Sequence, residues 1–266
     1  MKIYKINAVA LALGFLLLQS QALASGSKTN YNPLHVSGGI AMPASSTAVH
    51  SNPAGIITAP TAVVLQAGAP KIWDNGTYRA GLQTNGSSWG VAGGIEDQTF
   101  GNNNGNNNSN SSSLLAYYGM AVGTESFTLG LAGRTGISNS SGTALNVGLL
   151  FGVGSSARVG MTAWGINSGA YEWGAGAAFG VGQGFDLVLD AAADSNLANL
   201  QIKPGVKVSG SQAALTLSYG TGARAQFADG FTAGASFIFA SNNTLELQYN
   251  AGGALSKYFA ALTIGL

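Results

Sequence analysis

The last eleven residues of the chain, SKYFAALTIGL from Ser256 to Leu266, alternate between apolar side chains and mostly polar or small ones. Successive side chains of a β-strand point to opposite faces. One face of this strand would carry Tyr258, Ala260, Leu262, Ile264 and Leu266. The other face would carry Lys257, Thr263 and Gly265, with Phe259 and Ala261 as apolar exceptions. Nearly every upstream segment repeats this alternation, which predicts an all-β fold: a closed antiparallel transmembrane β-barrel with lipid outside and a polar or small-residue lumen.

The composition agrees with a barrel in lipid. Charged residues make up only 8% of the chain, and 40 of its 266 residues are glycine. The charge is too low for an ordinary soluble surface, and the glycine content is too high for a helical core. In a lipid-embedded barrel the outward positions are apolar, and all backbone polar groups pair around the closed sheet. A soluble β-sandwich would explain the alternation but not the missing charge.

The N-terminus has the features of a signal peptide over residues 1–24. Lys2 and Lys5 precede an apolar run near residues 8–18, and Ala22-Leu23-Ala24 precedes Ser25 as a small-residue cleavage site. The apolar run is shorter than the ~20 residues that a membrane-spanning helix needs. We therefore expect export to the bacterial outer membrane, with membrane lipid as a partner and the barrel assembly machinery recognising the C-terminal strand.

Charge and residue types exclude several functions. Without Lys2 and Lys5, nine basic residues face ten acidic ones, a net charge of −1 with no basic face for nucleic acid. The chain has no cysteine, so neither disulfides nor thiolate metal sites can form. The two histidines, His35 and His50, lie outside the predicted strands and lack nearby carboxylates. We expect no enzyme activity, no cofactor and no metal.

The remaining chain divides into a plug and a barrel. Residues 25–60 hold four of the six prolines and no sustained alternation, which predicts an N-terminal hatch inside the lumen or across its periplasmic mouth. Residues 61–266 predict the barrel, with fourteen strands as the favoured count and twelve as the next. The expected strands lie near 61–69, 77–83, 88–95, 113–122, 125–135, 143–153, 157–165, 170–181, 185–193, 199–208, 212–219, 231–240, 244–251 and 256–266.

Charged residues fix the register of one strand pair. A hairpin turn near residues 195–198 would set Asp190 opposite Lys203 and Asp186 opposite Lys207, all facing the lumen. A Lys on the lipid face at mid-bilayer would cost about 2–4 kcal/mol, which favours this inward assignment. Pro204 then faces lipid and suggests a bulge or bend. The four charges fit either structural pairing or an ion-selecting constriction.

Other predicted features follow from parity and composition. The remaining charges on the lumen side are Arg134, Glu246, Arg79, Arg158, Glu172 and Lys257. Aromatic residues near the strand ends predict interfacial girdles: Trp89, Trp164, Trp173, Tyr171, Tyr219, Tyr249 and Tyr258. Trp164 is an exception, because the alternation of its strand places it on the lumen side. The Asn-, Ser- and Gly-rich residues 101–113 predict a mobile polar loop on the cell exterior.

The hatch segment carries a recognisable motif. Gly38-Gly39-Ile40-Ala41, Ser45-Ser46-Thr47-Ala48 and Asn52-Pro53-Ala54-Gly55-Ile56 together resemble the hatch of FadL-type outer-membrane transporters of long-chain fatty acids and aromatic hydrocarbons. The resemblance implies a fourteen-stranded barrel with ligand moving sideways through a wall opening beside the hatch. Asn52, Pro53, Ala54 and Gly55 would then shape this gate, or would brace and seal a small barrel. The chain is shorter than family members with long apolar loops, so an external hydrophobic groove is not expected.

Two functions are compatible with this reading. The first is a FadL-like channel that passes hydrophobic or small amphipathic molecules by diffusion. The second is a porin-like or structural barrel without dedicated cargo, which self-associates through small outward residues. These residues are Ala175, Ala177, Ala233 and Ala235.

Overall fold

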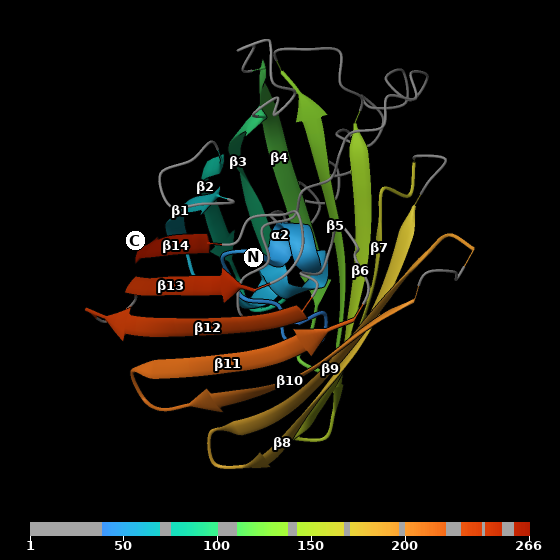
Figure 1. The fold of residues 1–266 in the computed structure, drawn as a ribbon, viewed down its shortest axis with the longest axis vertical. Coiled ribbons are helices and arrows are strands. Elements are labelled where there is room, and N and C mark those ends of the chain that lie inside the picture. Colours follow the sequence, from blue (N-terminus) through green and yellow to red (C-terminus); the bar gives the residue numbers. More distant parts are fainter. Residues whose placement is uncertain are drawn as a thin grey trace, which may run out of the picture.

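The computed structural model describes residues 39–69, 76–100, 111–137, 143–167, 171–196, 200–221, 230–240, 243–251 and 258–266, the side chains of 98–100 and 111–113 excepted. Within these ranges fourteen antiparallel strands form one closed barrel, in which β1 pairs with both β2 and β14 (Figure 1). The strands are β1 (Ala62–Ala69), β2 (Thr77–Asn85), β3 (Trp89–Phe100), β4 (Ser111–Gly123), β5 (Phe127–Gly136), β6 (Ala144–Val153), β7 (Ala157–Trp164), β8 (Glu172–Gly182), β9 (Phe185–Asp194), β10 (Gln201–Ser209), β11 (Ala213–Gly220), β12 (Gly230–Phe239), β13 (Asn243–Asn250) and β14 (Tyr258–Gly265). The predicted fourteen-stranded barrel is confirmed.

The two ends of the barrel differ in their connections. The turns from even- to odd-numbered strands span two or three residues each: 86–88, 124–126, 154–156, 183–184, 210–212 and 240–242. The connections at the other end are longer, and β1 begins and β14 ends at the tight-turn end. In outer-membrane barrels the short turns are periplasmic and the longer loops extracellular. The two ends of this barrel differ in the same way.

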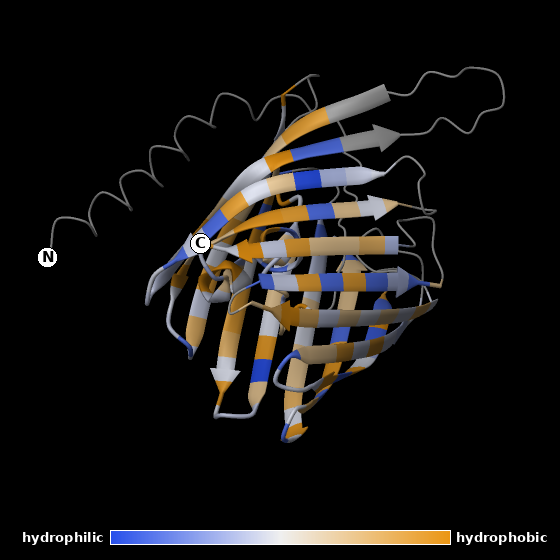
Figure 2. Ribbon diagram, turned by 90° about the vertical axis from the view of Figure 1, so that its left-hand side faces the viewer, coloured by the Kyte–Doolittle hydropathy of each residue, from blue (hydrophilic) through white to orange (hydrophobic). Residues whose placement is uncertain are grey.

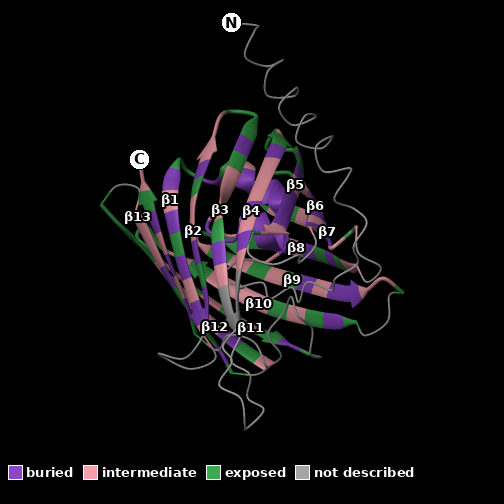
Figure 3. Cartoon of the chain, turned by 90° about the horizontal axis from the view of Figure 1, so that it is seen from above, coloured by how far each residue is buried: buried purple, intermediate pink, exposed green. Residues whose placement is uncertain are grey.

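The strand faces alternate as the sequence predicts. On β11, Leu215 and Leu217 are 57% and 46% exposed, whereas Thr216 and Ser218, which alternate with them, are half-buried. Figure 3 shows the same alternation of exposed and buried positions around the barrel, and Figure 2 shows the hydropathy of its strands. On β14 the two apolar exceptions, Phe259 and Ala261, are buried inside. The outer wall is therefore apolar, as hydrocarbon requires.

Two strand details depart from expectation. β3 extends to Phe100 and β4 begins at Ser111, so part of the expected polar loop is strand; residues 101–110 lie outside the described residues. Pro204 causes no register shift. Instead, β10 pairs with β11 only over residues 205–209, and a single bridge between Ile202 and Thr221 continues the same register beyond the proline. A residue without an N–H interrupts the ladder in this way. The register shift lies at Gly180 and Gly182 in the β8–β9 pair.

Most predicted girdle aromatics lie on the outside. Trp89, Trp173, Tyr219, Tyr249 and Tyr258 are exposed. The prediction is wrong for Trp164, which is 2% exposed and faces the lumen. Its indole is held there by hydrogen bonds to the hatch that are described below.

Residues 39–60 lie within the ring of strands, and we call these residues the hatch (Figure 1). They form the short helix α2 (Ala48–Ser51) and the 3-10 helix η1 (Pro53–Thr58). η1 packs against β3, β4, β5 and β6. No described helix has the length and apolar character needed to cross a membrane.

Candidate functional site

The backbone of the hatch contacts the barrel wall directly, because the wall residues that face it there are glycines. A Cβ atom at Gly130 would lie well under 3.0 Å from the backbone nitrogen of Ala54, and one at Gly160 would collide with the carbonyl oxygen of Ile40. Glycine is the residue that permits such close backbone approach. We call this set of inward-facing glycines the glycine strip. Its members are Gly90, Gly119, Gly130, Gly148, Gly160 and Gly176, one from each strand between β3 and β8.

Asn52 connects the two parts of the hatch with each other and with the wall. Its Nδ2 donates to the carbonyl oxygen of Ile40 at 2.8 Å and to that of Leu149 on β6 at 3.1 Å. Its Oδ1 accepts from the backbone N–H of Ala54 at 3.2 Å and so caps η1, which begins with Pro53. The amide fits here because Gly148 leaves space for it. The side chain of Asn52 is fully buried.

Wall side chains hold the hatch from several other strands. The indole Nε1 of Trp164 on β7 donates to the carbonyl oxygens of His50 and Ser51 at 3.0 and 3.1 Å. Asp190 on β9 accepts from the backbone N–H of Ile40 at 2.9 Å. The hydroxyl of Ser46 donates to Glu246 on β13. Two amide side chains also donate to hatch carbonyls: Gln66 on β1 to Ser46 and Asn85 on β2 to Ile57.

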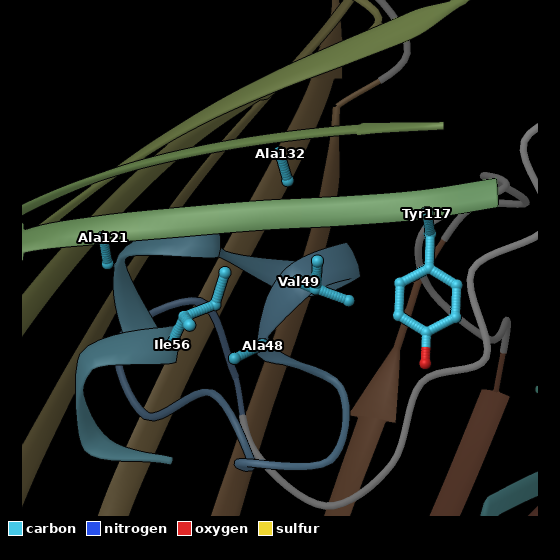
Figure 4. Close-up of a cluster of buried hydrophobic side chains, with 6 residues drawn as sticks. All are labelled: Ala48, Val49, Ile56, Tyr117, Ala121 and Ala132. Atoms are coloured by element: carbon cyan, nitrogen blue, oxygen red, sulfur yellow. The ribbon is translucent and has the colours of Figure 1, made fainter. Parts of the chain in front are cut away.

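Apolar packing adds to these hydrogen bonds. Val49 of α2 and Ile56 of η1 lie against Ala121 and Ala132 of the wall (Figure 4). Tyr117 on β4 belongs to the same cluster, and its ring meets the ring of His50 edge-on with centroids 5.1 Å apart. His50 is therefore part of the packing between hatch and wall.

A buried ionic cluster lies on β2, β3 and β5. Arg79 Nε donates to Glu96 Oε2 at 2.6 Å, and Arg134 Nη1 donates to Glu96 Oε1 at 3.0 Å. Arg79 Nη1 also donates to Gln66 Oε1 at 3.3 Å. All three charged side chains are almost fully buried. Sequence reasoning placed Arg134 in the lumen but missed Glu96, because the expected strand ended one residue before it.

The strand pair β9–β10 has the predicted register, with Lys203 opposite Asp190 and Lys207 opposite Asp186. The two acids facing the hatch are covered by it: Asp190 is 4% exposed and Glu246 is 6% exposed. Lys203 and Lys207 remain half-buried. In the described part of the barrel, Asp186 and Lys207 make no direct ion pair, and Lys207 interacts electrostatically with Glu246.

A cavity of about 30 Å³ lies between the hatch and the wall formed by β9 to β13. Gly39 and Met42 line it from the hatch side. Polar wall residues of both charge signs line the other side: Asp190, Lys203, Lys207, Thr216, Ser218, Thr232 and Gln248. A second cavity of about 10 Å³ lies between Val49, Ile56 and the wall at β1 to β4. A cavity of roughly 150 Å³ is needed to hold benzene, so neither space takes an aromatic ring without movement.

The hatch motif that the sequence predicts as a gate packs against a continuous wall. Pro53 and Ala54 lie on Gly130, and Asn52 lies on Gly148. The β5–β6 pairing that carries these glycines is unbroken. In this structure Asn52, Pro53, Ala54 and Gly55 brace the hatch, and their part in a lateral gate stays a prediction. His35, Lys257 and the predicted signal segment lie outside the described residues. Among the residues that the structure describes, no group of three His, Cys, Asp or Glu side chains could hold a metal.

Replacing Trp164 with phenylalanine is expected to destabilise the protein by about 1–3 kcal/mol. The change leaves two buried carbonyl oxygens of the hatch without their indole donor. The matched control is Trp173→Phe, since Trp173 is 42% exposed on the outer face. Denaturant titration of the protein in phospholipid vesicles measures both effects, and equal stabilities for the two variants would contradict the assignment.

Comparison with solved structures identifies the fold. The toluene transporter TbuX of Ralstonia pickettii superimposes with a TM-score of 0.57, at 9% sequence identity over 90% of this chain and 97% of TbuX. The monoaromatic hydrocarbon channel CymD superimposes with a TM-score of 0.55, at 12% identity over 88% of this chain and 97% of CymD. No family model and no curated protein sequence matches the chain. The resemblance to FadL-type channels is thus confirmed at the level of the fold.

Proposed function

We propose that the protein is an outer-membrane channel that passes small amphipathic molecules by passive diffusion, with the hatch setting the width of the passage. The observation that carries the proposal is the uneven filling of the lumen. The hatch covers the wall from β3 to β8 through the glycine strip. The wall from β10 to β13 keeps a lining of polar side chains, of which Thr216 and Ser218 are half-buried and Thr232 and Gln248 are buried.

The outer surface supports a location in the outer membrane, with lipid as the surrounding partner. Apolar side chains alternate outward on strand after strand, and exposed aromatic residues lie at several strand ends. Only closed barrels and helices can span a membrane with all backbone groups paired. β14 ends at the tight-turn end, where we expect the barrel assembly machinery to bind it.

The lining argues for amphipathic rather than long apolar cargo. Hydroxyl, amide, ammonium and carboxylate groups line the cavity between the hatch and β9 to β13: Thr216, Ser218, Thr232, Gln248, Lys203, Lys207 and Asp190. A long hydrocarbon chain would have to dehydrate these groups without replacing their hydrogen bonds, which is unfavourable. TbuX and CymD share the fold, but their hydrocarbon cargo is not implied for this chain.

Proteoliposome swelling tests the proposal. We expect rapid swelling with aminobutyrate, a small amphipathic solute, and no swelling above that of empty liposomes with a disaccharide. Equal rates for both solutes would instead indicate an open porin. Uptake of a fluorescent long-chain fatty acid in the same liposomes would contradict a passage whose polar lining excludes long apolar chains.

The absence of any flux would favour the alternative function, a structural barrel. The small cavities and the hydrogen bonds that hold the hatch from six strands are the observations on its side. Such a barrel would self-associate in lipid through small outward residues such as Ala175 and Ala177 on β8.

A further inference from the structure

We propose that residues 39–46 of the hatch form a strap that is latched to the barrel wall by two acid–lysine couples and can release while α2 and η1 stay seated. The couples are Asp190 with Lys203 and Glu246 with Lys207. In each couple the acid holds the strap, and the lysine is a positioning residue that compensates the charge of the acid. The inference concerns how the hatch is held, and so it goes beyond the proposed passage of solutes.

The strap is attached to the wall by a carboxylate near each of its ends. Near its beginning, Asp190 on β9 accepts a hydrogen bond from the backbone N–H of Ile40 at 2.9 Å. A Cβ atom at Gly39 would overlap this carboxylate, so the strap backbone lies directly on it. At the other end, the hydroxyl of Ser46 donates to Glu246 on β13. Both carboxylates are buried where the strap meets the wall.

Lysines on β10 supply the counter-charges. Lys203 is directly opposite Asp190 in the β9–β10 pair and interacts electrostatically with it. Lys207 interacts electrostatically with Glu246. A buried carboxylate that loses its counter-charge is strongly destabilising, because nothing then offsets its desolvation. Release of the strap would let water hydrate the carboxylate, so the loss of either lysine should shift the strap toward its released state.

Apolar packing with the wall is more extensive for α2 and η1 than for the strap. Val49 of α2 and Ile56 of η1 belong to the largest cluster of buried apolar residues in the described part of the chain. The strap contributes Ile40 to a smaller cluster, with Trp164 on β7 and Ala192 on β9. The strap therefore depends more on its polar anchors than the two short helices do.

The space beside the strap can hold water. The cavity of about 30 Å³ that Gly39 and Met42 line has room for roughly one water molecule. Thr232 lines the same cavity, and its buried hydroxyl has no hydrogen-bond partner in the described part of the protein. Such a group normally binds water. Water beside the strap can replace the hydrogen bonds of the latch, whereas the apolar packing of α2 and η1 has no such substitute.

Thiol labelling of the full-length protein in phospholipid vesicles tests the proposal. Met42 lies between the two anchors and Ser51 lies in α2, so Met42→Cys reports on the strap and Ser51→Cys on the rest of the hatch. We expect Lys203→Gln to raise the rate of maleimide labelling about tenfold in the Met42→Cys protein and to leave it nearly unchanged in the Ser51→Cys protein. Lys207→Gln should have the same effect through Glu246.

A second background separates charge compensation from packing. Asp190→Asn removes the charge but keeps an oxygen that can accept from the N–H of Ile40. Adding Lys203→Gln to Asp190→Asn should therefore change the labelling rate of the Met42→Cys protein by less than about twofold. Equal acceleration by Lys203→Gln in both backgrounds would show that the lysine acts by packing and would overturn the latch.

Arg158→Gln is the matched control. It removes one positive charge from the inner face of β7, where Arg158 is opposite Gly152 and Ala178 rather than an acid, and should leave both labelling rates unchanged. Unchanged labelling of the Met42→Cys protein in the lysine variants would overturn the latch. Equal acceleration in the Ser51→Cys protein would overturn the separate release of the strap. None of these measurements depends on solute flux, so they leave the proposed channel function to its own test.

Discussion

Replacing Gly130 with valine is expected to displace the hatch and raise single-channel conductance several-fold. The added Cβ would collide with the backbone of Pro53 and Ala54, which cannot rotate away as a flexible side chain can. β5 is fixed by continuous pairing with β4 and β6, so the hatch must give way. Overpacking a tightly packed site costs about 1–3 kcal/mol, enough to unseat a segment that forms no strand pairing with the wall.

Because the chain has no cysteine, labelling of an introduced thiol gives a second measurement of hatch displacement in the same variant. Ser51 is buried in the hatch, so Ser51→Cys introduces a single thiol that should react slowly with a maleimide while the hatch is seated. Adding Gly130→Val should make this reaction much faster. Gly182→Val is the control, because a Cβ there meets no atom within 4 Å. Unchanged conductance and labelling in the Gly130 variant would show that the hatch does not lie on the glycine strip.

Glu96→Gln is expected to lower the free energy of unfolding by about 3–5 kcal/mol. The carboxylate lies between two buried guanidinium groups, and its loss leaves the charges of Arg79 and Arg134 without their shared counter-charge. Denaturant titration in vesicles measures the change. Glu125→Gln, in the exposed turn before β5, should stay within about 0.5 kcal/mol of the wild type.

A double substitution separates charge pairing from simple loss of packing. Arg134→Gln added to Glu96→Gln removes one of the two uncompensated cations, so the double variant should be more stable than the sum of the single variants predicts. Strict additivity of the two single effects would contradict a coupled ionic cluster.

The barrel wall could be predicted from the sequence because each strand encodes its own orientation. On β9 and β10, apolar side chains on the outer face alternate with Asp186, Asp190, Lys203 and Lys207 on the inner face. A one-residue slip of the register would point these charged side chains toward hydrocarbon. The register of this pair follows directly from that pattern. The prolines of the hatch segment predict a plug inside the lumen or across its periplasmic mouth, and the Asn-Pro-Ala-Gly motif agrees with such a plug.

The contacts between hatch and wall could not be predicted, because they join residues far apart in sequence without a periodic signal. The parity of Gly130 places it inside, but only the seated hatch shows that it faces Ala54. Trp164 had lumen parity, and its girdle assignment failed because the hatch offers two carbonyl acceptors that an interface does not. The expected strand ends at residue 95 and so leaves Glu96 off the wall, yet two arginines from other strands compensate its charge inside the barrel.

Site-directed spin labelling of β11 in lipid vesicles tests the central claim most directly, because the account places lipid against one face of this strand and the polar side of the lumen against the other. Labels at Leu215, Leu217 and Tyr219 should collide strongly with oxygen dissolved in the bilayer. Labels at Thr216 and Ser218 should collide weakly with oxygen and remain accessible to a small water-soluble relaxation agent. The account predicts this two-residue periodicity along the strand, and equal accessibility at all five positions would contradict it.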